Sequence, residues 1–325
     1  MYDVVAFGEA MIRLTSPPHL RLEQTNTLDV TVGGGELNVA VSCARLGLRS
    51  AWVSRLTDSP LGRMIADRGR EHGVDMSHII WTKGDRVGLY FVEIGAAPRA
   101  SRVYYDRAHS AISQVRPDEI DWSLLADARL FHVGGITPAL SPSAAEASAV
   151  SLAEAKRHGC KVTFDLNYRA TLWSQDEARE CCTRLMEHVD VLISTSDDTE
   201  RVFGMTGEPA DVARQLRDRF GFEAVAITIR TVRGVRAGAW TAIVLAGDTL
   251  HTDKSYDLEI VDRIGSGDAF SAGFIYGYLR DDVEMGLKYG NALSVIKHSH
   301  WGDFCYFTEA ELKDQITGAG LKIHR

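Results

Sequence analysis

The sequence has few cysteines and no long apolar run, and both absences narrow what the protein can be. Its 325 residues include five cysteines, an odd number without CxxC spacing. This argues against a disulfide framework or a zinc site and is typical of a reducing cytoplasm. No stretch reaches the ~18 apolar residues of a membrane span, and the first eight residues lack the basic region of an export signal. We therefore expect a cytoplasmic protein that is not anchored in a membrane.

Positive charge is also in short supply. The chain carries 36 Lys and Arg against 44 Asp and Glu, a formal net charge of −8, and no run of basic residues offsets this balance. A nucleic acid or an anionic membrane is therefore a poor partner, and a small molecule is favoured. With 45% hydrophobic and 25% charged residues, the chain has the composition of a globular protein large enough for a full core.

Strand-like and helical apolar patterns alternate along most of the chain. A short apolar run at 3–7 predicts a buried strand, and a helix at 37–46, a strand at 51–56 and a helix at 61–72 follow. The alternation continues to a strand at 224–230. Repeated units of this kind form a doubly wound, mostly parallel sheet with helices on both faces. We therefore predict an α/β fold whose ligands collect at the carboxyl ends of the strands.

Four segments break this pattern and instead alternate polar and apolar residues, namely 11–16, 28–32, 87–94 and 102–107. They come in two pairs and predict half-exposed strands outside the main sheet. Two surface hairpins without a function would give the same pattern. The more specific interpretation is a small sheet that covers the ligand site. The predicted division is a core of residues 1–10, 33–84 and 108–325 and a lid of residues 11–32 and 85–107.

The run D-R-I-G-S-G-D-A-F-S-A-G-F at 262–274 joins a glycine turn, a carboxylate and a helix start. The first amides of a helix have no intrahelical acceptor, so this start can hold a phosphate in transfer. Asp268 would lie beside that phosphate, where a carboxylate is unfavourable unless it takes a proton from the attacking hydroxyl. The run thus predicts the base of a kinase. The alternative is that Asp268 only favours the helix start and the glycines merely turn the chain.

The same run resembles the C-terminal signature of the ribokinase/pfkB family of sugar kinases. In the N-terminal half, G-G-G-E-L-N-V-A at 33–40 and A-R-L-G at 44–47 are similar to the sugar-loop motif of that family. Four further runs narrow the resemblance to the 2-keto-3-deoxygluconate kinases: Y-Y-D-R-A-H-S-A at 104–111, G-I-T-P at 135–138, D-L-N-Y-R-A-T-L-W at 165–173 and G-D-F at 302–304. The resemblance implies a ribokinase-like fold with a β-clasp lid. It also implies ATP and Mg²⁺ as cofactors, and phosphorylation of 2-keto-3-deoxygluconate at its terminal hydroxyl.

Local reasoning and this resemblance together select the candidate site residues. Tyr105 and Arg107 share one face of a strand, where a phenol and a guanidinium could receive a hydroxyl and a carboxylate. An exposed strand face with a routine ion pair is the alternative. The predicted catalytic residues are Asp268, Gly265, Ser266 and Gly267. The predicted substrate contacts are Gly34, Asn38, Tyr90, Tyr105, Arg107, Arg169, Asp268 and Asp303. The predicted nucleotide contacts are Asn167, Thr195, Asp198, Arg230, Gly265, Gly267 and Asn291.

Three departures from the family pattern lie in the nucleotide half. The usual Asn-x-x-Glu is here Thr195-x-x-Asp198, whose shorter carboxylate is expected to reach magnesium through water. Arg230 stands where many relatives have a glycine, and it could reach a phosphate of ATP instead. Ser266 replaces the commoner alanine of the anion loop, and its hydroxyl either caps the helix or has no role. None of these departures removes the predicted base, Asp268, or the predicted phosphate site.

Other functions predict other residues. A fructokinase or another hexose kinase is the nearest alternative, but a neutral sugar requires neither Arg107 nor Arg169. A dinucleotide-dependent dehydrogenase would place its glycine turn after the first strand, and a non-catalytic sugar sensor could lose Asp268. No protein metal site is predicted, because His298 and His300 are two residues apart and do not face each other on a helix.

The apolar residues of 87–94 fall on both faces of the predicted lid strand. A lone four-stranded lid would leave one face in water and should alternate more cleanly. We therefore expect two lids to pair across a two-fold axis in a homodimer. The alternative is that the second apolar face only lines the sugar cleft.

Overall fold

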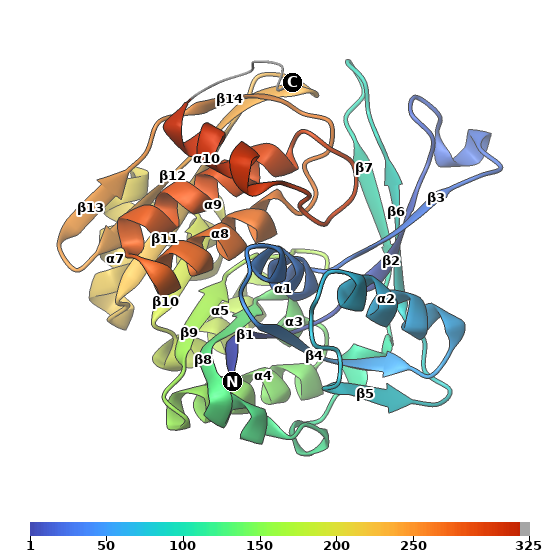
Figure 1. Ribbon diagram of the computed structural model, residues 1–325, viewed down its shortest axis with the longest axis horizontal. Coiled ribbons are helices and arrows are strands. Elements are labelled where there is room, and N and C mark those ends of the chain that lie inside the picture. Colours follow the sequence, from blue (N-terminus) through green and yellow to red (C-terminus); the bar gives the residue numbers. More distant parts are fainter. Residues whose placement is uncertain (319–325) are drawn as a thin grey trace.

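The computed structural model describes residues 1–318, which form a large sheet covered by helices and a small separate sheet (Figure 1). The large sheet has ten strands in the order β13-β12-β11-β10-β9-β8-β1-β4-β5, and β14 pairs with β12. Its strands are β1 Tyr2–Phe7, β4 Ser50–Thr57, β5 Ile79–Thr82, β8 Ala128–Gly134, β9 Lys161–Asp165, β10 Val191–Thr195, β11 Ala224–Val232, β12 Ala237–Ala246, β13 Thr249–Thr252 and β14 Tyr256–Glu259. Strands β5 to β11 of this order pair in parallel, which confirms the predicted doubly wound, mostly parallel fold.

Ten α-helices surround this sheet in the described part of the chain. They are α1 Gly35–Arg45, α2 Pro60–Glu71, α3 Ile136–Ala139, α4 Pro142–Arg157, α5 Gln175–Leu185, α6 Ser196–Phe203, α7 Pro209–Phe220, α8 Ser266–Arg280, α9 Val283–Lys297 and α10 Glu309–Thr317. None of them has both the length and the apolarity needed to cross a bilayer.

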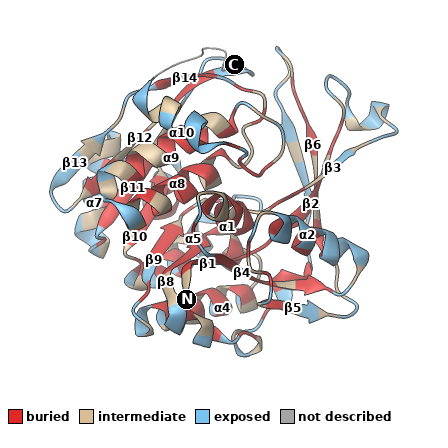
Figure 2. Ribbon diagram, viewed as in Figure 1, coloured by how far each residue is buried: buried red, intermediate tan, exposed pale blue. Residues whose placement is uncertain are grey.

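Alternation along the central strand β1 explains why helices cover both faces. Val5 and Phe7 belong to the core cluster that includes α4, α5, α6 and α7, whereas Val4 and Ala6 point to clusters built with α1, α2 and α8. Successive side chains of a strand point to opposite faces, so a strand that is apolar throughout needs cover on both. Figure 2 shows the consequence, since buried residues fill the central strands and α8 while α2 and α10 carry exposed faces.

The antiparallel edge of the large sheet was not predicted. Strands β12, β13 and β14 extend the sheet beyond β11 through antiparallel pairs. They lie between β11 and the glycine turn of α8. The hairpin between β11 and β12 includes Arg233 and Gly234, whose main-chain nitrogens donate to the carbonyl of Ala237.

The second sheet, which we call the lid sheet, has the order β3-β2-β6-β7. It consists of β2 Met11–Thr15, β3 Asp29–Gly33, β6 Gly88–Glu93 and β7 Arg102–Asp106. In Figure 1 it projects away from the helical layers on one side of the molecule. These are the four segments predicted as lid strands. The exact division of the chain into core and lid stays a prediction, and residues 319–325 of the predicted core lie outside the described residues.

Candidate active site

A cavity of about 720 Å³ opens between the lid sheet, the carboxyl ends of the central strands and the start of α8. Parallel strands present their carboxyl ends at one edge of a sheet, and ligands bind there in open α/β folds. All of the predicted site residues except Asn291 line this cavity. The sequence motifs that lie far apart along the chain are thus brought to one place.

Helix α8 begins at the glycine turn, with Gly265 as its N-cap in the left-handed region at a φ of 84°. A side chain at Gly265 would be strained, and its Cβ would lie 2.2 Å from the main-chain oxygen of Asp303. A Cβ on Gly267 would meet nothing within 4 Å, so the space beside the first turn is open. The hydroxyl of Ser266 is buried and has no hydrogen-bond partner among the described residues. The helix start therefore offers free donors to an anion.

Asp268 lies in the first turn of α8, and its carboxylate accepts a hydrogen bond from Asn38 on α1 at 2.6 Å. Asn38 Oδ1 in turn accepts from the main-chain nitrogen of Gly34 at 3.3 Å. Loss of hydration in the cavity raises the pKa of Asp268 to about 6, and the Asn38 bond opposes this rise. Because a general base works best near the ambient pH, this raised pKa suits proton abstraction.

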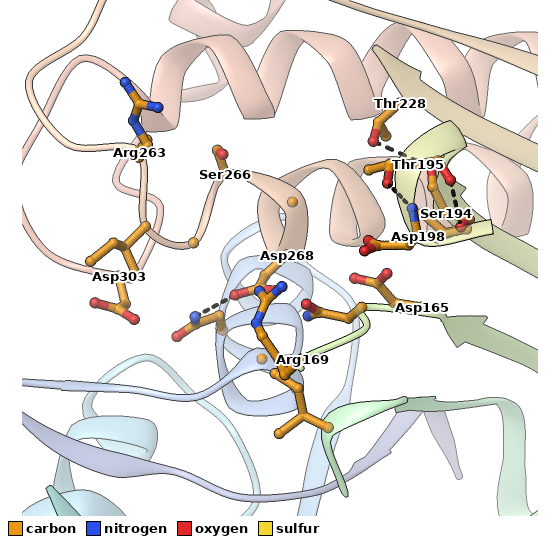
Figure 3. Close-up of a pocket in the computed structure, with 18 of the residues that line it drawn as sticks. Asp165, Arg169, Ser194, Thr195, Asp198, Thr228, Arg263, Ser266, Asp268 and Asp303 are labelled. Carbon is orange, nitrogen blue, oxygen red and sulfur yellow. Dashed lines mark hydrogen bonds between the residues drawn. The ribbon is translucent and has the colours of Figure 1, made fainter. Parts of the chain in front are cut away.

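Two further carboxyl groups lie close to Asp268. Burial raises the pKa of Asp165, at the end of β9, to about 8, and repulsion from Asp268 and Asp198 adds to the effect. Burial also raises the pKa of Glu36 to about 7, although Thr137 and the main chain of Gly134 donate to it at 2.9 and 3.0 Å. Figure 3 shows Asp165, Asp268 and the guanidinium of Arg169 directed into the same space. Like charges cannot all persist so close together, so this cluster holds protons near neutral pH.

On the lid side, most polar groups already have partners in the chain. Tyr90 donates to Asp303 at 2.7 Å and stacks on Tyr105 at a ring distance of 5.8 Å. Arg107 forms a salt bridge with Glu9, and its guanidinium lies over the Tyr105 ring. The predicted shared face of Tyr105 and Arg107 therefore exists, but the Arg107 charge is neutralised by Glu9.

On the core side, four arginines line the cavity without forming an ion pair within residues 1–318, namely Arg169, Arg201, Arg230 and Arg263. Arg169 donates only to the main chain of Tyr168, and Arg263 only to that of Val235. Arg230 lies over the ring of Trp240 at 5.6 Å. These guanidinium groups can bind anions without first breaking a salt bridge.

The predicted nucleotide residues Asn167, Thr195 and Asp198 meet at the ends of β9 and β10. Thr195 caps α6 by accepting from the main-chain nitrogen of Asp198 at 3.0 Å. Asn167 has a positive φ of 34°, a conformation that asparagine tolerates better than most residues. The described residues contain no cluster of three or more side chains suited to hold a metal ion on their own. Oxygen atoms of Asp198 and Thr195 are nevertheless of the kind that Mg²⁺ prefers.

The prediction that Asn291 contacts the nucleotide has to be corrected. This residue lies on α9 with a fully buried side chain and does not line the cavity. Its amide oxygen accepts from Trp240 Nε1 at 3.0 Å, and its amide nitrogen donates to Asp253 at 2.9 Å. With both ends of the amide engaged, Asn291 packs the core behind the site.

Sequence reasoning missed several residues that the structure brings to the cavity, namely Glu9, Glu36 and Arg263. Glu9 follows the first strand directly, and Glu36 stands inside the glycine-rich run that was singled out. Both positions thus carried a signal. Arg263 stands inside the run that contains Asp268, but nothing in the spacing distinguished its side chain.

The sequence matches a known family over most of the chain. A sequence model described as pfkB family carbohydrate kinase covers residues 1–303. The chain belongs to the pfkB family of carbohydrate kinases. It is therefore a carbohydrate kinase with a ribokinase-like fold, as the motifs predicted.

Several pfkB relatives have names that point to sugar acids. The chain is 38% identical over 324 residues to a 2-dehydro-3-deoxygalactonokinase of Haloferax volcanii, covering 99% of each chain. It is 32% identical over 303 residues to a 5-dehydro-2-deoxygluconokinase of Geobacillus kaustophilus, covering 92% of this chain and 88% of the relative. A crystal structure of a 2-dehydro-3-deoxygluconokinase from Thermotoga maritima superposes with a TM-score of 0.94 at 39% identity and covers 98% of both chains. These similarities support a kinase that acts on a sugar acid.

Proposed function

We propose that the protein transfers the γ-phosphoryl group of ATP to the terminal hydroxyl of 2-keto-3-deoxygluconate. The products are 2-keto-3-deoxy-6-phosphogluconate and ADP. The observation that carries this proposal is the placement of Asp268 beside the start of α8 in the same cavity as Arg169. Base, anion site and a guanidinium without an ion pair are the three parts that phosphorylation of a sugar acid requires.

Each part has a defined task. Asp268 accepts the proton of the terminal hydroxyl, and Asn38 orients its carboxylate through the 2.6 Å hydrogen bond. The amides of Gly267 and Asp268, together with the Ser266 hydroxyl, donate to the phosphoryl group in transfer. Arg230 and Arg263 balance the charge of the remaining phosphates.

Mg²⁺ fits the nucleotide half of this cavity. Asp198 and Thr195 provide oxygen atoms near the strand ends, and burial raises the pKa of Asp198, which a nearby cation would lower again. When bound, the ion neutralises charge on the phosphates and so stabilises the transition state. The side chain of Asp198 is shorter than the usual glutamate, so we expect a water molecule between it and the ion.

A sugar acid is preferred over a neutral sugar because of Arg169. Its guanidinium faces the cavity near Asp268 and forms no ion pair in the described chain. A substrate carboxylate can therefore form an ion pair with it. A hexose has no carboxylate to pair with this guanidinium. The named relatives also act on dehydro-deoxy sugar acids according to their names, although these names differ in the sugar.

A coupled assay of ADP release tests the proposal. The panel contains 2-keto-3-deoxygluconate, its galactonate epimer, 5-keto-2-deoxygluconate, fructose and ribose. We expect the highest kcat/KM for the first compound and little turnover of the neutral sugars. A higher kcat/KM for fructose would replace the proposal with a hexose kinase, and a preference for the galactonate epimer would change the named substrate but not the class.

We further propose that the protein is a homodimer that associates through the lid sheet. On the outer face of this sheet Val30 is 48% exposed and Tyr104 44% exposed. Leu14 and Leu89 are only partly buried against the core cluster. A second lid would cover these apolar groups. Sedimentation at micromolar concentration tests this, and a fully active monomer would rule it out.

A further inference from the structure

Arg13 is a buried cation to which the reaction described above assigns no task. It lies on β2 of the lid sheet, and its side chain is 1% exposed. Its Nη2 pairs with Asp262 at 2.6 Å, its Nη1 with Asp303 at 2.8 Å, and its Nε donates to Thr15 at 2.9 Å. Because a guanidinium is planar and its donors are fixed in a fork, these three bonds hold it in one orientation.

The two carboxylates belong to the segments that border the start of α8. Asp262 accepts from the main-chain nitrogen of Ile264 at 3.0 Å and of Gly302 at 3.2 Å. Asp303 accepts from Arg13 with one oxygen, and its main-chain oxygen packs against Gly265. Arg13 therefore joins a lid strand to both sides of the turn that forms the anion site.

The lid contributes a second contact to the same carboxylate. Tyr90 on β6 donates to the other oxygen of Asp303 at 2.7 Å. The main chain of Gly33 lies against this bond, since a Cβ there would be 2.1 Å from Asp303 and 2.5 Å from the Tyr90 hydroxyl. Tyr90 and Gly33 line the cavity, so the face that meets the sugar also fixes Asp303.

A further cation completes the cluster behind the anion site. Lys297 on α9 is fully buried, and its ammonium donates to the main-chain oxygens of Asp262 and His300, each at 3.3 Å. Two cations, Arg13 and Lys297, thus balance two carboxylates, Asp262 and Asp303. A buried set of this kind often adds little stability compared with apolar residues of similar volume. Its value lies in fixing one arrangement of the segments it connects.

We propose that Arg13 is a positioning residue that couples the lid sheet to residues 262–268. When the sugar engages the lid face around Tyr90, the fork of Arg13 holds Asp262 and Asp303 in place. The start of α8 is thereby held in the position needed for phosphoryl transfer. This inference rests on the kinase reaction proposed above.

Arg13→Lys is the decisive variant, because lysine keeps the charge but cannot donate to both carboxylates from a fixed fork. We expect binding of the sugar acid and of ATP close to wild type. We expect kcat to fall about 100-fold, since displacement by ~1 Å is enough for such a loss. In the wild type, the sugar acid should slow amide hydrogen exchange in residues 262–268, and in the variant this protection should be lost.

Arg55→Lys is the matched control. Arg55 is an arginine with a 12% exposed side chain, which pairs with Asp85 at 2.7 Å and donates to the main chain of Ala111 at 2.8 Å. It does not line the cavity. This variant should lose thermal stability while keeping kcat and the exchange protection. A merely structural role of Arg13 would give the two variants the same behaviour.

Wild-type kcat in Arg13→Lys, or a lower kcat with intact exchange protection, would overturn the proposal. If that variant does not fold, Thr15→Val decides instead, because it removes only the acceptor of Nε and leaves every charge. A smaller fall in kcat with weakened protection then supports the coupling, and wild-type behaviour overturns it. Failure of the wild type to phosphorylate any sugar acid would be a separate result. The Arg13 comparison is then made with whichever sugar the wild type accepts.

Discussion

Two arginines of the lid sheet region differ from the cavity-lining arginines of the core in whether they are paired with a carboxylate. Arg107, directly after β7, and Arg13 on β2 are both paired with buried carboxylates. In the described chain, Arg169, Arg230 and Arg263 have no ion pair. Carboxylates of the chain itself pair with Arg13 and Arg107, which indicates a structural role for these two arginines. The core arginines form no salt bridge within the part of the chain that the structure describes and can therefore bind the anions of the ligands without breaking one.

This difference changes the expected roles of the two arginines assigned to the sugar acid. The sequence predicted both Arg107 and Arg169 among the contacts to a sugar acid. In the structure Arg107 already pairs with Glu9, whose side chain is 2% exposed. To bind a substrate carboxylate, Arg107 would have to share its donors or leave Glu9 buried alone. Arg169 has no such cost and is the better candidate.

Asp268 lies where the two regions meet, and its replacement should give the largest effect. Asp268→Asn keeps an oxygen that can accept from Asn38 but removes the base. We expect kcat to fall by ~10²–10⁴-fold while substrate binding is kept. Coupled ADP release and calorimetric binding measure the two quantities. Unchanged turnover would remove the catalytic role of Asp268, and Asp248→Asn, at a fully exposed position, is the control.

Arg107→Met should mainly affect stability, if the lid arginines are structural. The change leaves Glu9 buried with the Ser110 hydroxyl as its remaining side-chain donor at 2.6 Å. Loss of one partner of a buried ion pair lowers the free energy of unfolding by roughly 3–5 kcal/mol. Urea denaturation measures this change. The double variant Arg107→Met with Glu9→Gln should recover part of the loss, because it removes the unpaired charge.

The opposite result for Arg107 would break the comparison. If Arg107→Met unfolds like the wild type and only raises KM for the sugar acid, this arginine acts as the core arginines do. The lid would then supply a charge to the substrate in spite of the salt bridge with Glu9.

Arg169→Met should affect recognition and leave stability nearly unchanged, because no salt bridge is lost. A charge-assisted hydrogen bond is worth ~1.5–3 kcal/mol, so KM for the sugar acid should rise about 10-fold to 100-fold. KM for a neutral sugar should change little. Steady-state kinetics with both compounds test this. Equal effects on the two sugars would favour the hexose kinase.

The sequence predicted those parts of the molecule that depend on local patterns. The alternation of strand-like and helical patterns predicted the parallel sheet. The glycine turn before Asp268 predicted the helix start and the candidate base. Four segments with strand-like alternation gave the lid strands. These features depend on residues close together in the chain, so their periodicity and turn chemistry suffice.

Other features depend on distant partners that no local pattern shows. The Glu9–Arg107 bridge joins residues 98 positions apart, and the Arg13–Asp303 bond spans 290 positions. The sequence therefore could not show that Arg107 is neutralised. Asn291 was misplaced for the same reason, since Trp240, 51 positions away, takes its amide oxygen. The antiparallel pairing of β12 is likewise set by its register with β11.

The raised pKa of Asp268 gives the last and smallest expected effect. Burial raises this pKa from 3.8 to about 6, so kcat/KM should fall tenfold per pH unit below about pH 6 as the base becomes protonated.

The raised pKa of Asp268 also makes the stability of the folded state depend on pH. The folded state binds this proton more tightly than the unfolded state, so the contribution to stability is full below the unfolded pKa and is lost as the pH rises through about 6. Asp268→Asn should therefore raise Tm at about pH 8 and leave it almost unchanged near pH 4. Scanning calorimetry at both values checks this, with Asp248→Asn as the exposed control. A Tm of Asp268→Asn below that of the wild type at the higher pH would contradict this expectation. It would show that the core arginines stabilise the ionised Asp268 carboxylate more strongly than the raised pKa of Asp268 indicates.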